Sequence, residues 1–218
     1  MRTSSLFAAF LAGFALAGTA QATRLTFVGL PDGRLGPTAN TSYGDRVVSA
    51  GTGVTLDGGA TPNVVLDFVP LSSTQSSFEV YSSGYSGLLH ALGDGSFNVP
   101  GYVQLTPDTG WDVVLESFQV GAWSSGSYTG SRIRVEDLQT NVLFDTGSFT
   151  FPGNTVFSYP DTPIRSSVAL RVYINEFGDL GLDNLQFSQV ATIPEPSTWA
   201  LWLAGAGLLG ARVLRRKR

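Results

Sequence analysis

The stretch V168-A-L-R-V-Y-I-N175 decides the fold of this 218-residue chain. Its aliphatic residues occupy every second position, and the positions between them include Arg171, Tyr173 and Asn175. Successive side chains of a β-strand point to opposite faces, so this alternation predicts a strand with one buried face and one polar face. The same period of two recurs at Ile133 and Val135, and again at Phe78 and Val80.

Most of the chain between residues 23 and 190 repeats this pattern and predicts an all-β fold. Glycine, proline, asparagine and aspartate interrupt the strands at intervals typical of β-sandwiches. We expect eight or nine strands, which must pair antiparallel because short loops cannot make parallel crossovers. The alternation changes phase near Ser117, and again at Asp183 and Asn184, which predicts a bulge or bend at each place.

The composition excludes several classes of function. The chain has no cysteine, so disulfides, thiolate metal sites and cysteine nucleophiles are absent. Between Thr23 and Pro196 there are 7 arginines against 17 carboxylates, a net charge of −10. This acidic body argues against a nucleic-acid partner, which needs a basic face. The charge fits a solvated surface, and a specific cation-binding role is the alternative.

The N-terminus has the form of a secretory signal peptide, residues 1–22. A positive start at Arg2 precedes an uncharged apolar segment from Leu6 to Ala17, and small residues follow at Ala20 and Ala22. We expect signal peptidase to cut after Ala22, and the mature β-sandwich domain to occupy residues 23–192. The alternative, a retained anchor, would need a longer apolar run.

The C-terminal segment, residues 193–218, predicts a membrane anchor. An apolar helix is expected at about residues 199–214, and at 1.5 Å per residue it reaches about 24 Å, short of the roughly 30 Å hydrocarbon core. The basic tail sets the orientation, because positive residues stay on the cytoplasmic side, so the body faces outward. This tail consists of Arg215, Arg216, Lys217 and Arg218.

The prolines before this helix, Pro194 and Pro196, bracket Glu195 and force an extended, accessible stretch. The order of Pro-Glu-Pro, Ser197, Thr198, Trp199, a short apolar helix and a basic tail resembles the PEP-CTERM sorting signal of Gram-negative bacteria. The resemblance departs from the usual pattern only at Ile193, where valine is common.

The resemblance to PEP-CTERM signals implies that the tail is a temporary anchor. The membrane enzyme exosortase would cut near residues 194–196, after transient attachment to the inner membrane. The protein would then reach the cell surface or the extracellular space, often in species that make exopolysaccharide. A permanent single-pass tail is the alternative.

The second half of the body resembles the galactose-binding-like jelly rolls that accompany this sorting signal. The residues that carry the resemblance are 111–123, 133–137 and 181–187. Related jelly rolls often hold a structural calcium near their terminal strands. The resemblance therefore nominates Asp183, with Asp179 nearby, although aspartates are also ordinary turn residues.

Catalytic groups are scarce, and we expect no enzymatic activity. His90, the single histidine, lies among aliphatic residues, as a packed or loop histidine would. A G-x-S-x-G elbow is missing, and the G-x-G-x-x-G spacing at residues 205–210 follows no strand, so a nucleotide site is rejected. Spacing alone cannot exclude a glycosidase-like pair among the carboxylates.

Four aromatic residues next to glycine or serine are candidates for stacking on sugar rings: Tyr81, Tyr85, Trp123 and Tyr128. Packing within the domain is the alternative role for each of them. The sequence thus predicts an exported matrix or surface protein whose sandwich associates with exopolysaccharide. The alternative is a structural or adhesive module without a small-molecule ligand.

Overall fold

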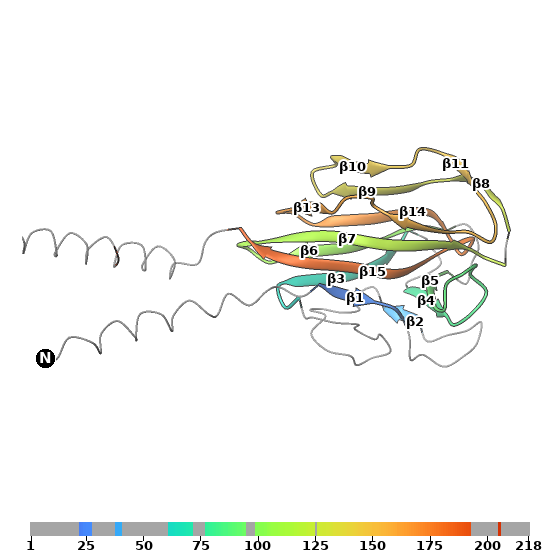
Figure 1. The fold of residues 1–218 in the computed structure, drawn as a ribbon, viewed down its shortest axis with the longest axis horizontal. Coiled ribbons are helices and arrows are strands. Elements are labelled where there is room, and N and C mark those ends of the chain that lie inside the picture. The colour runs from blue at the N-terminus through green and yellow to red at the C-terminus, as the bar shows by residue number, and fades with distance from the viewer. Residues whose placement is uncertain are drawn as a thin grey trace, which may run out of the picture.

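The computed structural model describes residues 22–27, 38–40, 61–71, 77–94, 99–124, 126–192 and 205. Within these ranges the chain forms strands β1 to β15, and the pairing is almost entirely antiparallel (Figure 1). The all-β, antiparallel prediction is therefore confirmed. The expected eight or nine strands were too few, because several strands are short and some neighbours share one partner: β12 and β13 pair in turn with β7.

The first layer contains five strands in the order β10-β9-β14-β6-β3, all antiparallel. Their bounds are β3 Val64–Pro70, β6 Val99–Pro107, β9 Ile133–Asp137, β10 Val142–Asp145 and β14 Leu170–Phe177. Buried and part-exposed residues alternate along β3, β9 and the first part of β14, as their sequences predict. One face of this layer is therefore core and the other is polar.

The second layer is built on the pairing of β7 (Trp111–Ala122) with β15 (Leu180–Ala191). Beyond β7 lie β12 (Val156–Tyr159) and β13 (Ile164–Ser166). Beyond β15 lie β1 and β5, and β5 continues through β4 to β2. The bounds of these last four are β1 Thr23–Leu25, β2 Thr38–Asn40, β4 Ser77–Tyr81 and β5 Ala91–Gly93.

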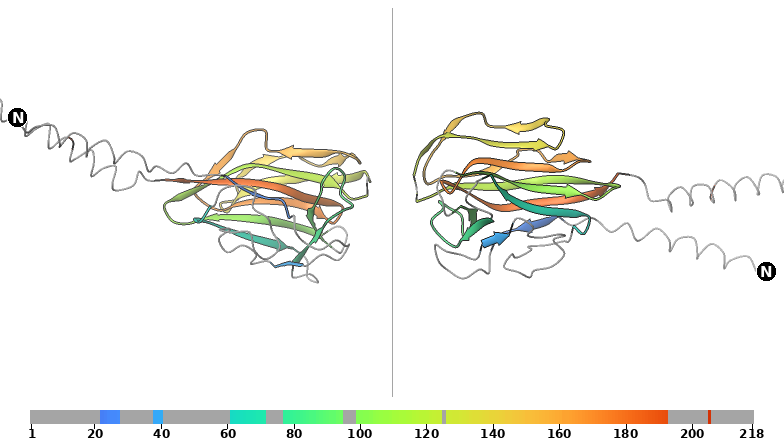
Figure 2. Two further views of the ribbon diagram at one scale, coloured as in Figure 1. Left: turned by 60° about the horizontal axis from the view of Figure 1, so that its bottom comes forward. Right: turned by 180° about the vertical axis from the view of Figure 1, so that it is seen from behind.

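One short parallel bridge, Phe177 to Leu180, joins the two layers where β14 turns into β15. A separate pair, β8 (Tyr128–Ser131) with β11 (Phe149–Phe151), lies beside the first layer (Figures 1 and 2). The inward faces of both layers form one hydrophobic cluster. Within it, the rings of Phe78 and Phe177 lie 4.5 Å apart and connect the second layer to the first.

The changes of alternation predicted near Ser117 and at Asp183 are both confirmed. Both lie in the pairing of β7 with β15, where the register is irregular. Between β15 and β7, the register shifts between Asp183 and Gln186, and again between Gln186 and Phe187. The second shift places an extra residue of β7 next to Ser117, which pairs with Gln186. Each extra residue moves the following side chains to the opposite face, so the core pattern resumes beyond the bulge.

The β7–β15 pairing also separates the two ends of the domain. Trp111 pairs with Ala191 at one end, and Ala122 pairs with Leu180 at the other, about 36 Å away at 3.3 Å per residue. The chain passes into its C-terminal segment at the first end, where the Thr192 N–H donates to the Gly110 carbonyl oxygen (2.9 Å). Thr23 pairs with Phe187, toward this same end of β15. We call it the tail end, and the opposite one the distal end.

Truncation of the ring that links the layers should destabilise the domain. We expect Phe177→Ala to lower the free energy of unfolding by about 3–5 kcal/mol, because it removes a fully buried ring and leaves a cavity. Urea unfolding followed by tryptophan fluorescence measures the change. Leu89→Ala is the control, because Leu89 is 78% exposed and its loss should alter stability by less than about 0.5 kcal/mol. Equal effects of the two changes would contradict this account of the core.

Candidate functional site

The four predicted sugar-stacking residues meet at the distal end. Trp123 follows β7 directly and forms an isolated β-bridge with Tyr85, which lies in the segment between β4 and β5. Tyr81 ends β4, and Tyr128 begins β8. Residues far apart in the sequence are thus brought into one cluster by the second layer. We call Tyr81, Tyr85, Trp123 and Tyr128 the aromatic cluster.

Three of these rings contact one another edge to face. The ring centroids of Tyr85 and Trp123 are 5.1 Å apart, those of Tyr81 and Trp123 are 5.5 Å apart, and those of Tyr81 and Tyr85 are 5.8 Å apart. Such edge-to-face pairs are each worth about 0.5–1.5 kcal/mol beyond the burial of their area. Gly84, at φ +104°, lies so close to Trp123 that a Cβ there would overlap the indole ring.

The tyrosine hydroxyl groups are held by defined acceptors. Tyr85 donates to the Gly178 carbonyl oxygen (2.9 Å), Tyr81 to Glu79 Oε2 (2.8 Å) and Tyr128 to the Trp123 carbonyl oxygen (2.9 Å). Burial raises the pKa of Tyr85 well above its usual value, and burial with the neighbouring Glu79 raises the pKa of Tyr81. The hydroxyls therefore stay protonated and act as donors at any physiological pH.

Burial divides the cluster into two pairs. Tyr81 and Tyr85 are 7% and 4% exposed, so their rings are packed within the domain rather than open to a ligand. Trp123 and Tyr128 are part-exposed. Tyr81 and Tyr85 therefore pack within the domain, which was the alternative role. Stacking on sugar rings stays a prediction for Trp123 and Tyr128.

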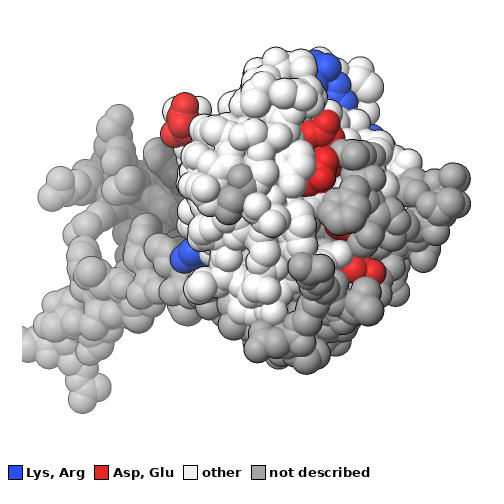
Figure 3. Space-filling view, turned by 90° about the vertical axis from the view of Figure 1, so that its right-hand side faces the viewer, with Lys and Arg blue, Asp and Glu red and all other residues white. Residues whose placement is uncertain are grey.

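Carboxylates surround the aromatic cluster. Asp94 and Asp179 act electrostatically on Tyr85, and burial with the neighbouring Glu176 raises the pKa of Asp179. Figure 3 looks onto the distal end and shows acidic groups within this face, while the lysine and arginine groups in view lie near its margin. The distal end therefore favours neutral or cationic ligands over anionic ones.

The structural calcium nominated at Asp183 and Asp179 stays a prediction. Calcium takes six to eight oxygen ligands. Both carboxylate oxygens of Asp183 accept hydrogen bonds from Asn184, at 2.7 Å from its N–H and 3.2 Å from Nδ2. In the described part of the chain, no three His, Cys, Asp or Glu side chains are grouped so that they could hold a metal ion, and this includes Asp179.

The outer face of the first layer carries a second aromatic and polar group, which the sequence interpretation did not single out. Tyr102 of β6 and Tyr173 of β14 are paired neighbours. The guanidinium of Arg171 lies 4.5 Å from the Tyr102 ring centroid, and that of Arg134 lies 4.8 Å from the Tyr173 ring centroid. In the sequence, the polar positions of the alternating strands could have pointed to this group. Only the register of the sheet shows which of those residues are neighbours.

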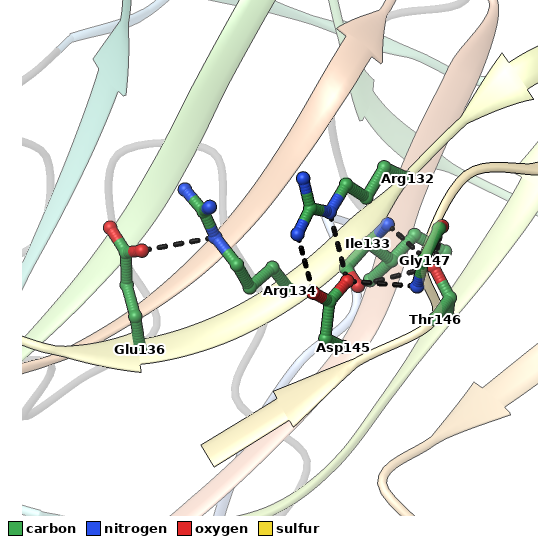
Figure 4. Close-up of polar contacts among 7 residues, drawn as sticks. All are labelled: Arg132, Ile133, Arg134, Glu136, Asp145, Thr146 and Gly147. Carbon is green, nitrogen blue, oxygen red and sulfur yellow. Dashed lines mark hydrogen bonds and ion pairs between the residues drawn. The ribbon is translucent and has the colours of Figure 1, made fainter. Parts of the chain in front are cut away.

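Carboxylates pair with Arg132 and Arg134 at one side of this face (Figure 4). Arg132 binds Asp145 with two hydrogen bonds, Nε to Oδ1 at 2.9 Å and Nη2 to Oδ2 at 2.5 Å. This pairing lowers the pKa of Asp145 to about 2. Arg134 Nε lies 3.0 Å from Glu136 Oε2, an ion-pair contact without the alignment of a hydrogen bond.

Residues 192–218 match the PEP-CTERM protein-sorting motif. The C-terminal segment therefore has the sequence pattern of an exosortase sorting signal. It begins at Thr192, the residue at which β15 has just ended. A PEP-CTERM motif directs a bacterial protein to export and to processing by exosortase, so this chain is sorted to the cell surface or the extracellular space. No curated protein matches the chain by sequence.

Several predicted features lie outside the described residues. They are Ala20, the sorting residues Pro194, Glu195 and Pro196, the basic residues Arg215, Arg216, Lys217 and Arg218, and the apolar segment 199–214 except for Gly205, which is helical. Among the described residues, no helix is long and apolar enough to cross a membrane. The signal peptide, the membrane helix and the details of the sorting site therefore stay predictions, although β1 begins directly after Ala22.

The contact between Gly84 and Trp123 can be tested with a matched pair of glycine substitutions. Gly84 (φ +104°) and Gly130 (φ +88°) share an unfavourable backbone conformation for alanine, but only Gly84 faces a side chain; nothing lies within 4 Å of a Cβ built at Gly130. We expect Gly84→Ala to lower the free energy of unfolding by about 1–3 kcal/mol more than Gly130→Ala, because of overpacking. It should also change the near-UV circular dichroism of Trp123. Identical spectra and stabilities would contradict the packing of the aromatic cluster.

Proposed function

We propose that this exported protein associates, through its β-sandwich, with the exopolysaccharide of a Gram-negative bacterium. The N-terminal signal peptide directs the chain across the inner membrane, where signal peptidase removes residues 1–22. A helix at about residues 199–214 then holds the protein in the membrane until exosortase acts. The body would meet the matrix after this step.

The observation that carries the proposal is the placement of Trp123 and Tyr128. Both are part-exposed and lie at the distal end, while the sorting tail begins about 36 Å away at the tail end. During membrane attachment this arrangement directs them away from the lipid. Aromatic rings at such an end suit stacking on pyranose faces, and the surrounding carboxylates suit hydrogen bonds to hydroxyl groups.

The proposal includes that the β-sandwich domain binds a ligand and has no enzymatic activity. His90 is the single histidine of the sequence, and it lies between β4 and β5 next to the exposed Leu89. A galactose-binding-like jelly roll is proposed for the same body, supported by its two antiparallel layers around one core. The burial of Tyr81 and Tyr85 favours the second candidate function, a structural or adhesive module without a small-molecule ligand.

The sorting part of the proposal is tested by removing the motif. When Pro194, Glu195 and Pro196 are all replaced by alanine, we expect an unprocessed chain to accumulate with the cells, because exosortase loses its extended recognition segment. Intact-mass analysis of cell-associated and extracellular protein reads both processing sites together. Ile193→Val is the control and should be processed normally. An extracellular form that still contains Arg215 to Arg218 would contradict sorting by cleavage.

The binding part is tested with polysaccharide extracted from the matrix of the producing culture. We expect Trp123→Ala to weaken retention by about three-fold to ten-fold, because it removes one stacking surface. Trp111→Ala, at the tail end, is the matched control and should leave retention unchanged. Near-UV circular dichroism confirms that Tyr81 and Tyr85 remain packed. If the unaltered protein retains no polysaccharide, the structural-module alternative stands instead.

A further inference from the structure

We infer that the outer face of the first layer is a binding site for an acidic polysaccharide, one whose sugars carry carboxylate groups. The site consists of Tyr102, Gln104, Arg134, Arg171 and Tyr173, and we call it the arginine–tyrosine face. It is distinct from the aromatic cluster at the distal end. This inference rests on the exopolysaccharide association proposed above and names a ligand class for it.

The sheet register builds the arginine–tyrosine face as two adjacent rows. In one row, Tyr173 of β14 pairs with Arg134 of β9 on one side and with Tyr102 of β6 on the other. In the next row, Arg171 of β14 pairs with Gln104 of β6. All five side chains are part-exposed, so they are open to solvent without being free to move widely. Neighbouring strands are about 4.8 Å apart, which places the two tyrosines side by side on β6 and β14.

The positive charge of Arg171 is the reason that we infer an acidic ligand. Its Nε donates to Gln104 Oε1 (2.9 Å), and its guanidinium lies over the Tyr102 ring at 4.5 Å from the centroid. Within the described residues it forms no ion pair with a carboxylate. Glu136 lies opposite Arg171 in the register, but its carboxylate contacts Arg134 instead. Within the described part of the chain, no carboxylate pairs with the terminal nitrogens of Arg171, while Nε and the Tyr102 ring hold the guanidinium in place.

A guanidinium held in this way matches a carboxylate better than a neutral hydroxyl. The planar fork of arginine binds carboxylates with two parallel hydrogen bonds, and such charge-assisted bonds are about twice as strong as neutral ones. Arg171 covers one face of the Tyr102 ring and Arg134 covers one face of the Tyr173 ring, so the ring of a sugar would lie against the part of each ring that remains exposed. A sugar acid offers both features, a carboxylate and a pyranose ring, in one residue.

The charge distribution of the whole domain favours this face over the distal end. The body carries 7 arginines against 17 carboxylates between Thr23 and Pro196. Arg134 of β9 and Arg171 of β14 lie on this face, and Arg132 precedes β9. Arg132 is paired with Asp145 and Arg134 with Glu136, and Asp67 of β3 lies beside Gln104, so Arg171 is the arginine of this group without a described ion pair. The distal end instead presents Asp179, Glu176 and other carboxylates. An anionic chain is repelled at the distal end, whereas on the first layer Arg171 offers it one counter-charge.

The test uses extracellular protein purified from a producing culture, with alginate as the acidic polysaccharide and dextran as the neutral one. We expect retention by alginate but not by dextran in affinity electrophoresis, and weaker retention at high salt. Arg171→Gln should weaken alginate binding by about ten-fold to a hundred-fold, since it removes a charge-assisted contact. Arg24→Gln is the matched control: it removes the same charge from β1, where Arg24 binds Asn184 and lies over no described aromatic ring.

Two substitutions of Tyr173 separate stacking from charge. Tyr173→Phe keeps the ring and should bind alginate normally, whereas Tyr173→Val keeps a strand-forming side chain without the ring and should bind several-fold more weakly. Thermal unfolding of each variant confirms that the domain is folded. Normal binding by Tyr173→Val would overturn the stacking role assigned to this ring.

The remaining outcomes distinguish this inference from the proposed function. If Arg171→Gln and Arg24→Gln weaken alginate binding equally, the effect is general charge attraction and the inference is wrong. If the protein binds extracted matrix polysaccharide but not alginate, the inference is wrong while the matrix association stands. If Trp123→Ala abolishes alginate binding and Arg171→Gln does not, the ligand binds at the distal end and the arginine–tyrosine face is overturned.

Discussion

The antiparallel pairing of β7 with β15 is the constraint on which the rest of this structure depends. The two twelve-residue strands join residues about seventy positions apart in the sequence, and they contribute much of the inward face of the second layer. Because β15 runs directly into the sorting segment, the same ladder that builds the core also determines where the tail begins. Stability of the domain and its presentation to the processing enzyme are therefore coupled.

The long ladder keeps the different tasks of the protein on different surfaces. The tail end receives Thr192 and the start of β1, the distal end holds the aromatic cluster with its carboxylates, and the first layer presents the arginine–tyrosine face to its side. The tail can be handled by a membrane enzyme without obstructing either of the other surfaces. The distal end is acidic and the first-layer face offers the guanidinium of Arg171, so one small domain would contact neutral and acidic regions of a matrix separately.

The fold was predictable where the signal is local. Alternation in β14 and β9 predicted their buried and polar faces, and the phase changes at Ser117 and Asp183 predicted the two irregularities of the β7–β15 ladder. The candidate site was less predictable. Tyr81 and Tyr85 are next to serine or glycine in the sequence, as loop residues often are. They are nevertheless buried, because Trp123 at the end of β7 packs against both rings.

The sequence by itself determined the strand periodicity, the acidic charge and the sorting tail, because each of these is written in consecutive residues and needs no long-range contact. Only the tertiary structure decided which polar faces become neighbours, as with Arg171 over Tyr102 and Arg134 over Tyr173. The physical reason is that strand pairing brings together residues from distant segments, and a shift of one residue in register would replace every one of those neighbours.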